Sequence, residues 1–239
     1  RRVVFVQQDP DLLPGMPRLI GASMESSPTL VDVDGDGIDD IVFATSDGEV
    51  SVARFSGGAF EMLPGWPQRF SLLPEQDPED PGNHLAQPAY ASGAVGANSS
   101  HAVLSSPAVA DLDADGSVEV VGASLNGELR VWHSDGTLAS GWPFVLDLSL
   151  VEGVNEAEHN NYDYGFFSTP ALGDLDGDGD LEVVIAAMDA RLYVFHHDGS
   201  FLDGFPVELR AEYQTSAGPQ SRGERIISSP ALGDVDGDG

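Results

Sequence analysis

The chain has 239 residues, of which 40 are acidic and 10 are basic, so its formal net charge at pH 7 is −30. A surface this acidic repels nucleic acids and anionic membranes, and the absence of Cys excludes a disulfide framework and thiol catalysis. The hydrophobic content of 41% is enough for a folded core, and no apolar run approaches the roughly 18 residues of a membrane span.

Near-copies of one acidic motif recur along the chain, beginning at Asp32, Asp111, Asp174 and Asp234. Each follows a small residue and a Pro, and the first three copies are followed by a Gly-aromatic-Pro triplet. Within each unit the apolar residues alternate with period two, and turn residues interrupt them at short intervals. The unit at 168–209 thus predicts four strands, in PALGDL, LEVVIAAM, ARLYVF and FLDGFPVEL. No segment predicts an amphipathic helix of ten or more residues.

Four short antiparallel strands repeated in this way are typical of β-propeller blades. We therefore predict an all-β fold, a β-propeller with an acidic loop between the first two strands of each blade. A solenoid or a run of separate sandwiches is the alternative architecture. The predicted divisions are a half blade at 1–25, blades at 26–70, 105–146 and 168–209, and the start of another blade at 228–239. The chain ends inside the fourth motif, so we interpret it as a fragment of a larger ring.

Three inserts, at 71–104, 147–167 and 210–227, fall at the same place in the repeat. Because successive strands alternate in direction, we expect the acidic loops on one face of the propeller and the inserts on the other. Variable loops on a constant scaffold are where recognition usually resides. The inserts carry aromatic, His and Arg side chains that could bind a glycan or an acidic partner, although ordinary loop packing is an alternative for each of them. The candidates are His84, Tyr90, His101, His159, Tyr162, Tyr164, Tyr213, Arg222 and Arg225.

The acidic motif has carboxylates at positions one, three, five and nine and, in its complete copies, a Gly at position six. This is what a hard, oxygen-seeking cation needs from a short loop, and an all-protein oxygen cage suits Ca²⁺ better than Mg²⁺. Metal-free Asp-rich turns are the alternative, but inward carboxylates would repel one another without a cation. An EF-hand would need Glu at position twelve, where the chain has Phe43, Gly122 and Ile185.

The whole unit, from its Ser-Pro pair to Gly-Trp-Pro, resembles the FG-GAP or VCBS-type repeats of secreted bacterial proteins, which are related to the calcium-binding propeller of integrin α chains. The resemblance implies three to four Ca²⁺ sites and an extracellular or cell-surface location. It implies as ligands Asp32, Asp34, Asp36, Asp40 and the Ile38 carbonyl; Asp111, Asp113, Asp115, Glu119 and the Ser117 carbonyl; Asp174, Asp176, Asp178, Glu182 and the Asp180 carbonyl; and, in the incomplete fourth copy, Asp234, Asp236 and Asp238. Ala114 replaces the Gly at position four, a small departure provided that the backbone there is not left-handed.

Two further positions of the repeat carry side chains that could bind a ligand. Met16, Trp66, Trp142 and Phe205 share one of them and could form a sugar-stacking ring, but the exchange of Trp for Phe and Met fits packing between blades better. His133, His196 and His197 fall near the end of the third strand. Neighbours on a strand point to opposite faces, so we interpret these His residues as solvated hairpin ends and not as a chelating pair.

The sequence has no GxSxG, HExxH or phosphate-cradling motif, and we assign no catalytic residue. We therefore expect an extracellular, calcium-stabilised binding or adhesion module that recognises a protein or polysaccharide through its inserts. We expect no nucleic-acid partner and no direct membrane insertion. The alternatives are the propeller of a secreted polysaccharide-active enzyme, such as a lyase, and a structural subunit that self-associates in a cell-surface filament or appendage.

Overall fold

The structure is a computed structural model that describes residues 16, 20, 22–71, 92, 102–147, 165–216, 218–223, 225–235 and 237. All regular secondary structure in these residues is β-strand. The same residues contain no helix that could span a membrane.

Three antiparallel sheets follow one another along the chain, and we call them blades 1, 2 and 3. Blade 1 contains β1 (Thr29–Val31), β2 (Asp40–Ala44), β3 (Glu49–Ser56) and β4 (Ala59–Met62), and β5 (Gln68–Arg69) pairs with the other end of β3. Blade 2 contains β6 (Ala108–Ala110), β7 (Glu119–Ala123), β8 (Glu128–His133) and β9 (Phe144–Val145). Blade 3 contains β10 (Ala171–Gly173), β11 (Glu182–Ala186), β12 (Arg191–Phe195) and β13 (Val207–Glu208). The predicted all-β fold with four-stranded antiparallel units is confirmed.

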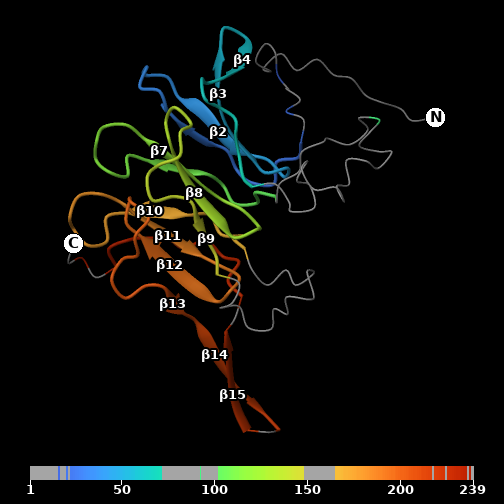
Figure 1. Cartoon of the computed structure of the whole chain (residues 1–239), viewed down its shortest axis with the longest axis vertical. Helices are drawn as coiled ribbons and strands as arrows, with labels where there is room; N and C mark the ends of the chain where they lie inside the picture. Colours follow the sequence, from blue (N-terminus) through green and yellow to red (C-terminus); the bar gives the residue numbers. More distant parts are fainter. Residues whose placement is uncertain are drawn as a thin grey trace.

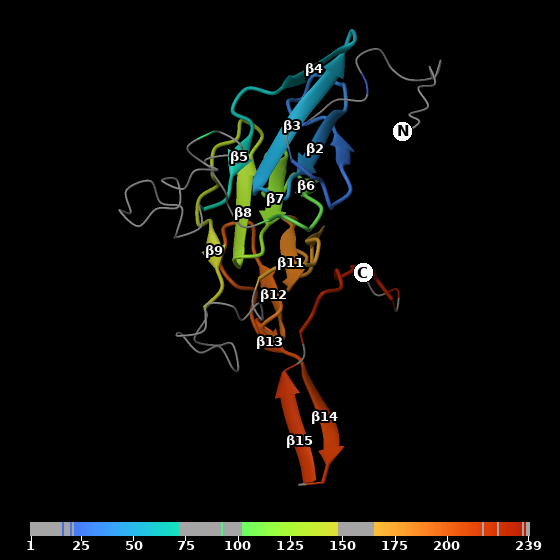
Figure 2. The same cartoon turned by 90° about the vertical axis from the view of Figure 1, so that its right-hand side faces the viewer.

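The blades are stacked in sequence order, as Figures 1 and 2 show from two directions. The loops that join the first two strands of each blade lie along the left side of the stack in Figure 1. A separate hairpin, β14 (Arg210–Thr215) with β15 (Gly218–Gly223), projects beyond blade 3. Within the described residues the sheets do not close into a ring.

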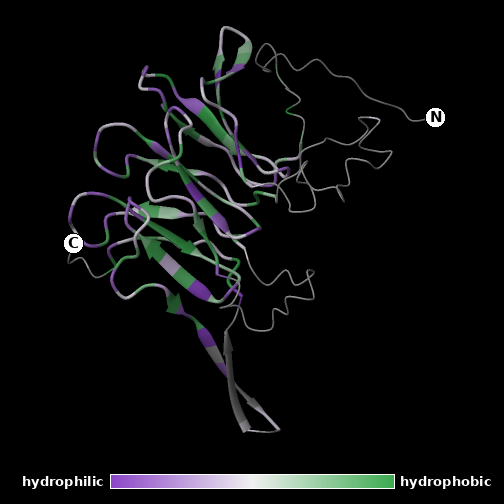
Figure 3. Cartoon of the chain, in the orientation of Figure 1, coloured by the Kyte–Doolittle hydropathy of each residue, from purple (hydrophilic) through white to green (hydrophobic). Residues whose placement is uncertain are grey.

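Two hydrophobic cores lie between the blades, one between blades 1 and 2 and one between blades 2 and 3. Neighbouring residues of β7 divide between them, because Val120 packs in the first core and Val121 in the second. A strand whose two faces are both buried needs apolar side chains at successive positions, not only at alternate ones. Figure 3 accordingly shows the hydrophobic residues concentrated on the stacked strands.

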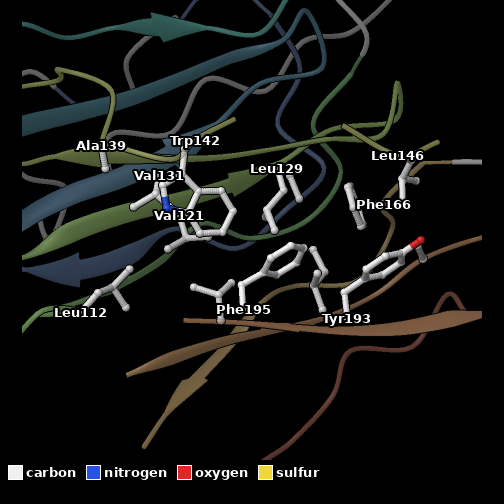
Figure 4. Packing of buried hydrophobic residues seen from close by; sticks show 14 residues of the cluster. Leu112, Val121, Leu129, Val131, Ala139, Trp142, Leu146, Phe166, Tyr193 and Phe195 are labelled. Carbon is white, nitrogen blue, oxygen red and sulfur yellow. The ribbon is translucent and has the colours of Figure 1, made fainter. Parts of the chain in front are cut away.

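The Trp of each Gly-Trp-Pro triplet packs between blades, as predicted. Trp66 lies edge-on to Trp132 with ring centroids 6.1 Å apart, and Trp142 lies 5.4 Å from the ring of Phe195. Figure 4 shows Trp142 on the blade 2 side of the second core, facing Phe195 and Tyr193 of blade 3. Both indoles are buried, so they are unavailable for sugar stacking.

The indole and the Gly of the triplet also contact the backbone of the next blade. The Nε1 atoms of Trp66 and Trp142 donate to the carbonyl oxygens of Ser134 and His197, each at 2.9 Å. Gly141 has φ +86°, and a Cβ there would lie 1.8 Å from the carbonyl oxygen of Asp198. A residue with a side chain cannot approach the neighbouring backbone so closely, so Gly is required.

A ladder of hydrogen bonds explains the Ser or Thr that precedes the Pro at the start of each unit. The backbone N–H of Ser27 donates to Ser106 Oγ at 3.1 Å, that of Ser106 to Thr169 Oγ1 at 3.0 Å, and that of Thr169 to Ser229 Oγ at 2.9 Å. Each hydroxyl thus accepts a hydrogen bond from the preceding unit. A Ser or Thr is the shortest side chain that can place an acceptor there.

Candidate metal centre at the acidic loops

Each acidic loop connects the first strand of a blade to the second. We call them loop 1 (32–40), loop 2 (111–119) and loop 3 (174–182), and the fourth copy, from Asp234, loop 4. The first carboxylate folds the loop around itself by accepting backbone hydrogen bonds. In loop 1, Asp32 Oδ1 accepts from Gly35 N at 2.8 Å and from Asp36 N at 3.1 Å, while its Oδ2 accepts from Gly37 N at 2.7 Å. This arrangement is the Asx-type turn that Asp and Gly favour.

The ninth carboxylate is buried in every blade and ties the beginning of the loop to the second strand. In each case it accepts a hydrogen bond from the backbone N–H of the second loop residue. The bonds run from Val33 N to Asp40 Oδ2 (3.1 Å), from Leu112 N to Glu119 Oε2 (2.9 Å) and from Leu175 N to Glu182 Oε2 (2.6 Å). A buried N–H must find an acceptor, so this residue is part of the fold whether or not an ion binds.

The seventh loop residue is hydrogen-bonded to the fifth carboxylate. The bonds run from Ile38 N to Asp36 Oδ1 (2.9 Å), from Ser117 N to Asp115 Oδ1 (2.7 Å) and from Asp180 N to Asp178 Oδ1 (3.1 Å). They hold the seventh residue inside the loop. That the carbonyl groups of these residues are ion ligands stays a prediction.

The first, third and fifth carboxylates gather in all three loops. Each set has one oxygen per residue within 4.8 Å of the others; the sets are Asp32, Asp34 and Asp36; Asp111, Asp113 and Asp115; and Asp174, Asp176 and Asp178. Loop 3 takes part in two more such groups, one of Asp178, Asp180 and Glu182 and one of Asp176, Glu182 and His196. These groups could hold a metal ion, and an all-oxygen donor set is the kind that hard divalent cations prefer.

Loop 3 also contains a buried oxygen that lacks a protein partner. Asp180 Oδ1 is inaccessible to solvent and has no hydrogen-bond partner among the described residues. Burial raises the pKa of Asp180, whereas the hydrogen bond from Asp180 N lowers the pKa of Asp178. An unsatisfied buried carboxylate oxygen is costly, and a cation would satisfy it. The residues of loop 3 therefore fit a bound ion.

A side chain with nitrogen donors from the third strand approaches the ninth carboxylate in every blade. His133 Nδ1 lies 3.2 Å from Glu119 Oε1, and His196 Nδ1 lies 3.2 Å from Glu182 Oε1. His197 reaches loop 3 as well, with its Nε2 atom 3.3 Å from Asp180 Oδ2. Each of these three His side chains thus contacts a carboxylate, which the interpretation as solvated hairpin ends missed, although His133 and His197 remain partly exposed.

Blade 1 has Arg54 at the position of these His residues, and its guanidinium lies against three carboxylates. Its Nη2 is 2.7 Å from Asp34 Oδ1 and 3.1 Å from Asp40 Oδ1, and its Nη1 is 2.7 Å from Asp36 Oδ2. The hydrogen bond to Asp34 raises the pKa of Arg54. The guanidinium of Arg54 thus already lies among the loop 1 oxygens that an ion would use. Loop 1 therefore fits a bound ion less well than loop 3 does.

Comparison with known proteins bears on this arrangement. Residues 174–239 match the family model for the FG-GAP-like repeat. The match begins at Asp174, the first carboxylate of loop 3, so the resemblance is confirmed for a segment that contains both loop 3 and loop 4. No curated protein sequence matches the chain.

Solved structures with a similar trace have low sequence identity to the chain. One is BBS1N in complex with ARL6DN, soaked with lead (TM-score 0.41, 12% identity, 84% of this chain and 48% of that one). Another is BamB from Moraxella catarrhalis (TM-score 0.41, 12% identity, 82% and 40%). A third is the computationally designed Ika4 protein (TM-score 0.35, 13% identity, 85% and 92%). The chain spans about half of the BBS1N chain and less of the BamB chain.

Loop 4, in the FG-GAP-like segment, begins with the same turn as loop 3. Asp234 Oδ1 accepts from Gly237 N at 2.6 Å, and Asp174 Oδ1 accepts from Gly177 N at 2.7 Å. Asp236 and Asp238 lie outside the described residues, so their predicted role as ligands stays a prediction.

Loop 2 departs from loops 1 and 3 at Ala114, which has φ +57°. The equivalent Gly35 and Gly177 have φ +75° and +79°. The left-handed backbone disfavours a Cβ, so the departure is larger than the sequence suggested. We expect Ala114→Gly to raise the free energy of unfolding by about 0.5 to 1 kcal/mol, because the relief of strain outweighs the added entropy of the unfolded chain.

Urea unfolding of the two proteins with a chelator present measures this difference without a contribution from bound ions. Ala110→Gly, in strand β6 of the same blade, is the matched control and is expected to destabilise. Equal or lower stability of the Ala114→Gly protein would contradict the explanation.

The third insert contains a β-hairpin, β14 with β15, for which the sequence analysis predicted no strands. Its two ends are bonded to the turn between β11 and β12, through Leu209 N to Ala190 O at 2.7 Å and Ile226 N to Ala187 O at 3.4 Å. Loop 3 lies at the other end of β11, so the hairpin and the acidic loop are at opposite ends of blade 3.

The predicted partner-binding residues are only partly covered by the structure. Tyr213 lies on β14 opposite Gln220, Arg222 lies on β15 opposite Ala211, and Arg225 is exposed just beyond the hairpin. The remaining candidates lie outside the described residues: His84, Tyr90, His101, His159, Tyr162 and Tyr164. Their role in partner binding stays a prediction.

Proposed function

We propose that the chain is part of an extracellular, calcium-stabilised β-propeller that binds a protein or polysaccharide partner through the end of the blades opposite the acidic loops. The observation that carries the proposal is that loop 3 and the β14–β15 hairpin lie at opposite ends of blade 3. Loop 3, with its gathered carboxylates and the orphaned Asp180 Oδ1, lies at one end, and the β14–β15 hairpin projects from the other.

The ions have a structural role in this proposal. A cation at loop 2 or loop 3 would neutralise carboxylates that belong to the connection between the first two strands of a blade, and so hold that connection closed. Sites built from one short loop bind calcium weakly and are occupied where free calcium is near millimolar, as it is outside cells. With no Cys in the chain, such ions would provide the cross-links that disulfides provide in many secreted proteins.

The hairpin is the part of the insert-bearing end that the structure describes. It projects away from the stacked blades (Figure 2). Arg210 at its base pairs with Glu208, and Arg225 lies exposed just beyond it. These Arg side chains support a glycan or a protein surface as the partner, and the net charge of −30 disfavours nucleic acid.

Calcium removal tests the first half of the proposal. A site with a Kd of about 0.1 mM stabilises the fold by roughly 1.4 kcal/mol in about 1 mM calcium, so two such sites contribute about 2.8 kcal/mol. We expect a chelator to lower the midpoint of thermal unfolding and added calcium to restore it, whereas magnesium at the same concentration restores less. A midpoint that is the same with chelator and with calcium would refute the structural role.

Retention on glycan and protein arrays tests the second half. We expect the chain to be retained with calcium present, and a variant in which a Gly-Ser turn replaces 211–222 to lose retention while it melts at the same temperature. Release of unsaturated products from an acidic polysaccharide would instead indicate a lyase. Ordered filaments in electron micrographs would indicate a structural subunit.

A further inference from the structure

We propose that Arg54 is the built-in cation of loop 1, so that this loop is closed by a guanidinium while loops 2 and 3 are closed by calcium. The inference rests on the proposed calcium binding and adds that the three loops, alike in sequence, are not alike in what neutralises them. It makes the side chain at one position of the third strand the determinant of whether a loop takes an ion.

In loop 1, each of the four carboxylates that an ion would use has a partner. The oxygens of Asp32 accept three backbone N–H groups. Asp34 and Asp36 each have an oxygen 2.7 Å from the guanidinium, and Asp40 is shared between Arg54 at 3.1 Å and Val33 N at 3.1 Å. Arg suits this role because its planar group presents five donors in a fixed fork and stays charged.

The corresponding side chains of the other blades are shorter and engage the loop differently. His133 lies 3.2 Å from the ninth carboxylate of loop 2. His196 lies 3.2 Å from that of loop 3 and 3.9 Å from Asp176 Oδ2. An imidazole has two ring nitrogens on opposite sides, so it cannot clamp three carboxylates as a guanidinium does. Among the described residues, the fifth carboxylate of both loops and the third of loop 2 thus have no ion pair, and the third carboxylate of loop 3 has only the 3.9 Å approach of His196, so these oxygens can take an ion.

An ion that enters loop 1 must first break the bonds of Arg54 to Asp34 and Asp36. Hydrogen bonds between charged groups contribute more than neutral ones, and the displaced guanidinium would remain close to the incoming positive charge. We expect calcium to bind loop 1 at least about tenfold more weakly than it binds loops 2 and 3, because each 1.4 kcal/mol of lost interaction corresponds to tenfold in affinity.

Counting bound ions by native mass spectrometry in a calcium titration tests the inference. We expect Arg54→His, which copies the residue of the other blades, to bind one more calcium ion per chain than the wild type. Arg54→Lys keeps the charge and is expected to gain none. Circular dichroism checks that each variant is folded. A folded Arg54→His protein that gains no ion would overturn the inference.

Substitutions in the loops themselves give an independent test that leaves Arg54 in place. We expect Asp36→Asn to leave the ion count of the wild type unchanged, whereas Asp115→Asn and Asp178→Asn each remove one ion. If Asp36→Asn also removes one ion, loop 1 binds calcium in the wild type and the inference is wrong. A wild type that binds no calcium at all overturns the proposed function itself, and the inference with it.

Discussion

Trp142→Ala is expected to lower the free energy of unfolding by about 4 kcal/mol, a typical cost for removing a large buried aromatic side chain. Trp142 is 6% exposed, packs 5.4 Å from the ring of Phe195, and donates a hydrogen bond to His197 O. The substitution therefore opens a cavity between blades 2 and 3 and leaves a carbonyl without its donor. Chemical denaturation followed by the remaining Trp fluorescence measures the loss.

Trp142→Phe is the matched control, because it keeps most of the ring packing and removes the N–H. We expect this variant to lose about 1 to 2 kcal/mol. The third triplet already has Phe205 at this position, so a Phe is compatible with the backbone of the repeat. If both variants unfold like the wild type, the triplet does not join the blades.

Glu182→Ala is expected to lower the free energy of unfolding by about 3 kcal/mol even with a chelator present. The carboxylate is fully buried, accepts from Leu175 N at 2.6 Å and lies 3.2 Å from His196 Nδ1. Truncation leaves the partly buried N–H of Leu175 without its acceptor and removes the carboxylate that lies against His196. Urea unfolding in chelator measures this structural part separately from any ion.

Glu182→Gln keeps an oxygen that can accept from Leu175 N, and its expected loss is about 1 kcal/mol in chelator. The two variants should nevertheless both bind calcium more weakly at loop 3, since neither offers a carboxylate at position nine. A Glu182→Ala protein as stable as the wild type in chelator would mean that the ninth carboxylate serves the ion alone.

Much of the fold could be predicted because it depends on local patterns. The period of two in segments such as LEVVIAAM and the Asp-Gly and Asn-Gly turns predicted four short strands per unit, and the structure has them. The acidic loops could be placed between the first two strands for the same reason. The third triplet has Phe where the first two have Trp66 and Trp142, and this exchange correctly favoured packing between blades and not a ring that stacks on sugars.

Some features lie in pairings that a repeat pattern does not display. The contact of Arg54, His133 and His196 with the ninth loop residue follows from the register of the second and third strands, in which Glu119 pairs with His133. Counting back from the three-residue hairpin turn at 125–127 would have found this pairing. The strained φ of Ala114 was signalled only by the Gly that loops 1 and 3 have at the same position, because an Ala by itself does not indicate a left-handed backbone.

The sequence by itself determined the strand pattern, the acidic loops and the apolar faces, because each depends on residues a few positions apart. Only the tertiary structure decided what neutralises each loop and how the blades are joined. The Arg54 guanidinium reaches its carboxylates over 14 to 20 residues, and the hydroxyl ladder joins residues 60 to 79 positions apart. Such contacts depend on strand register and on the stacking of whole blades, which local preferences do not specify.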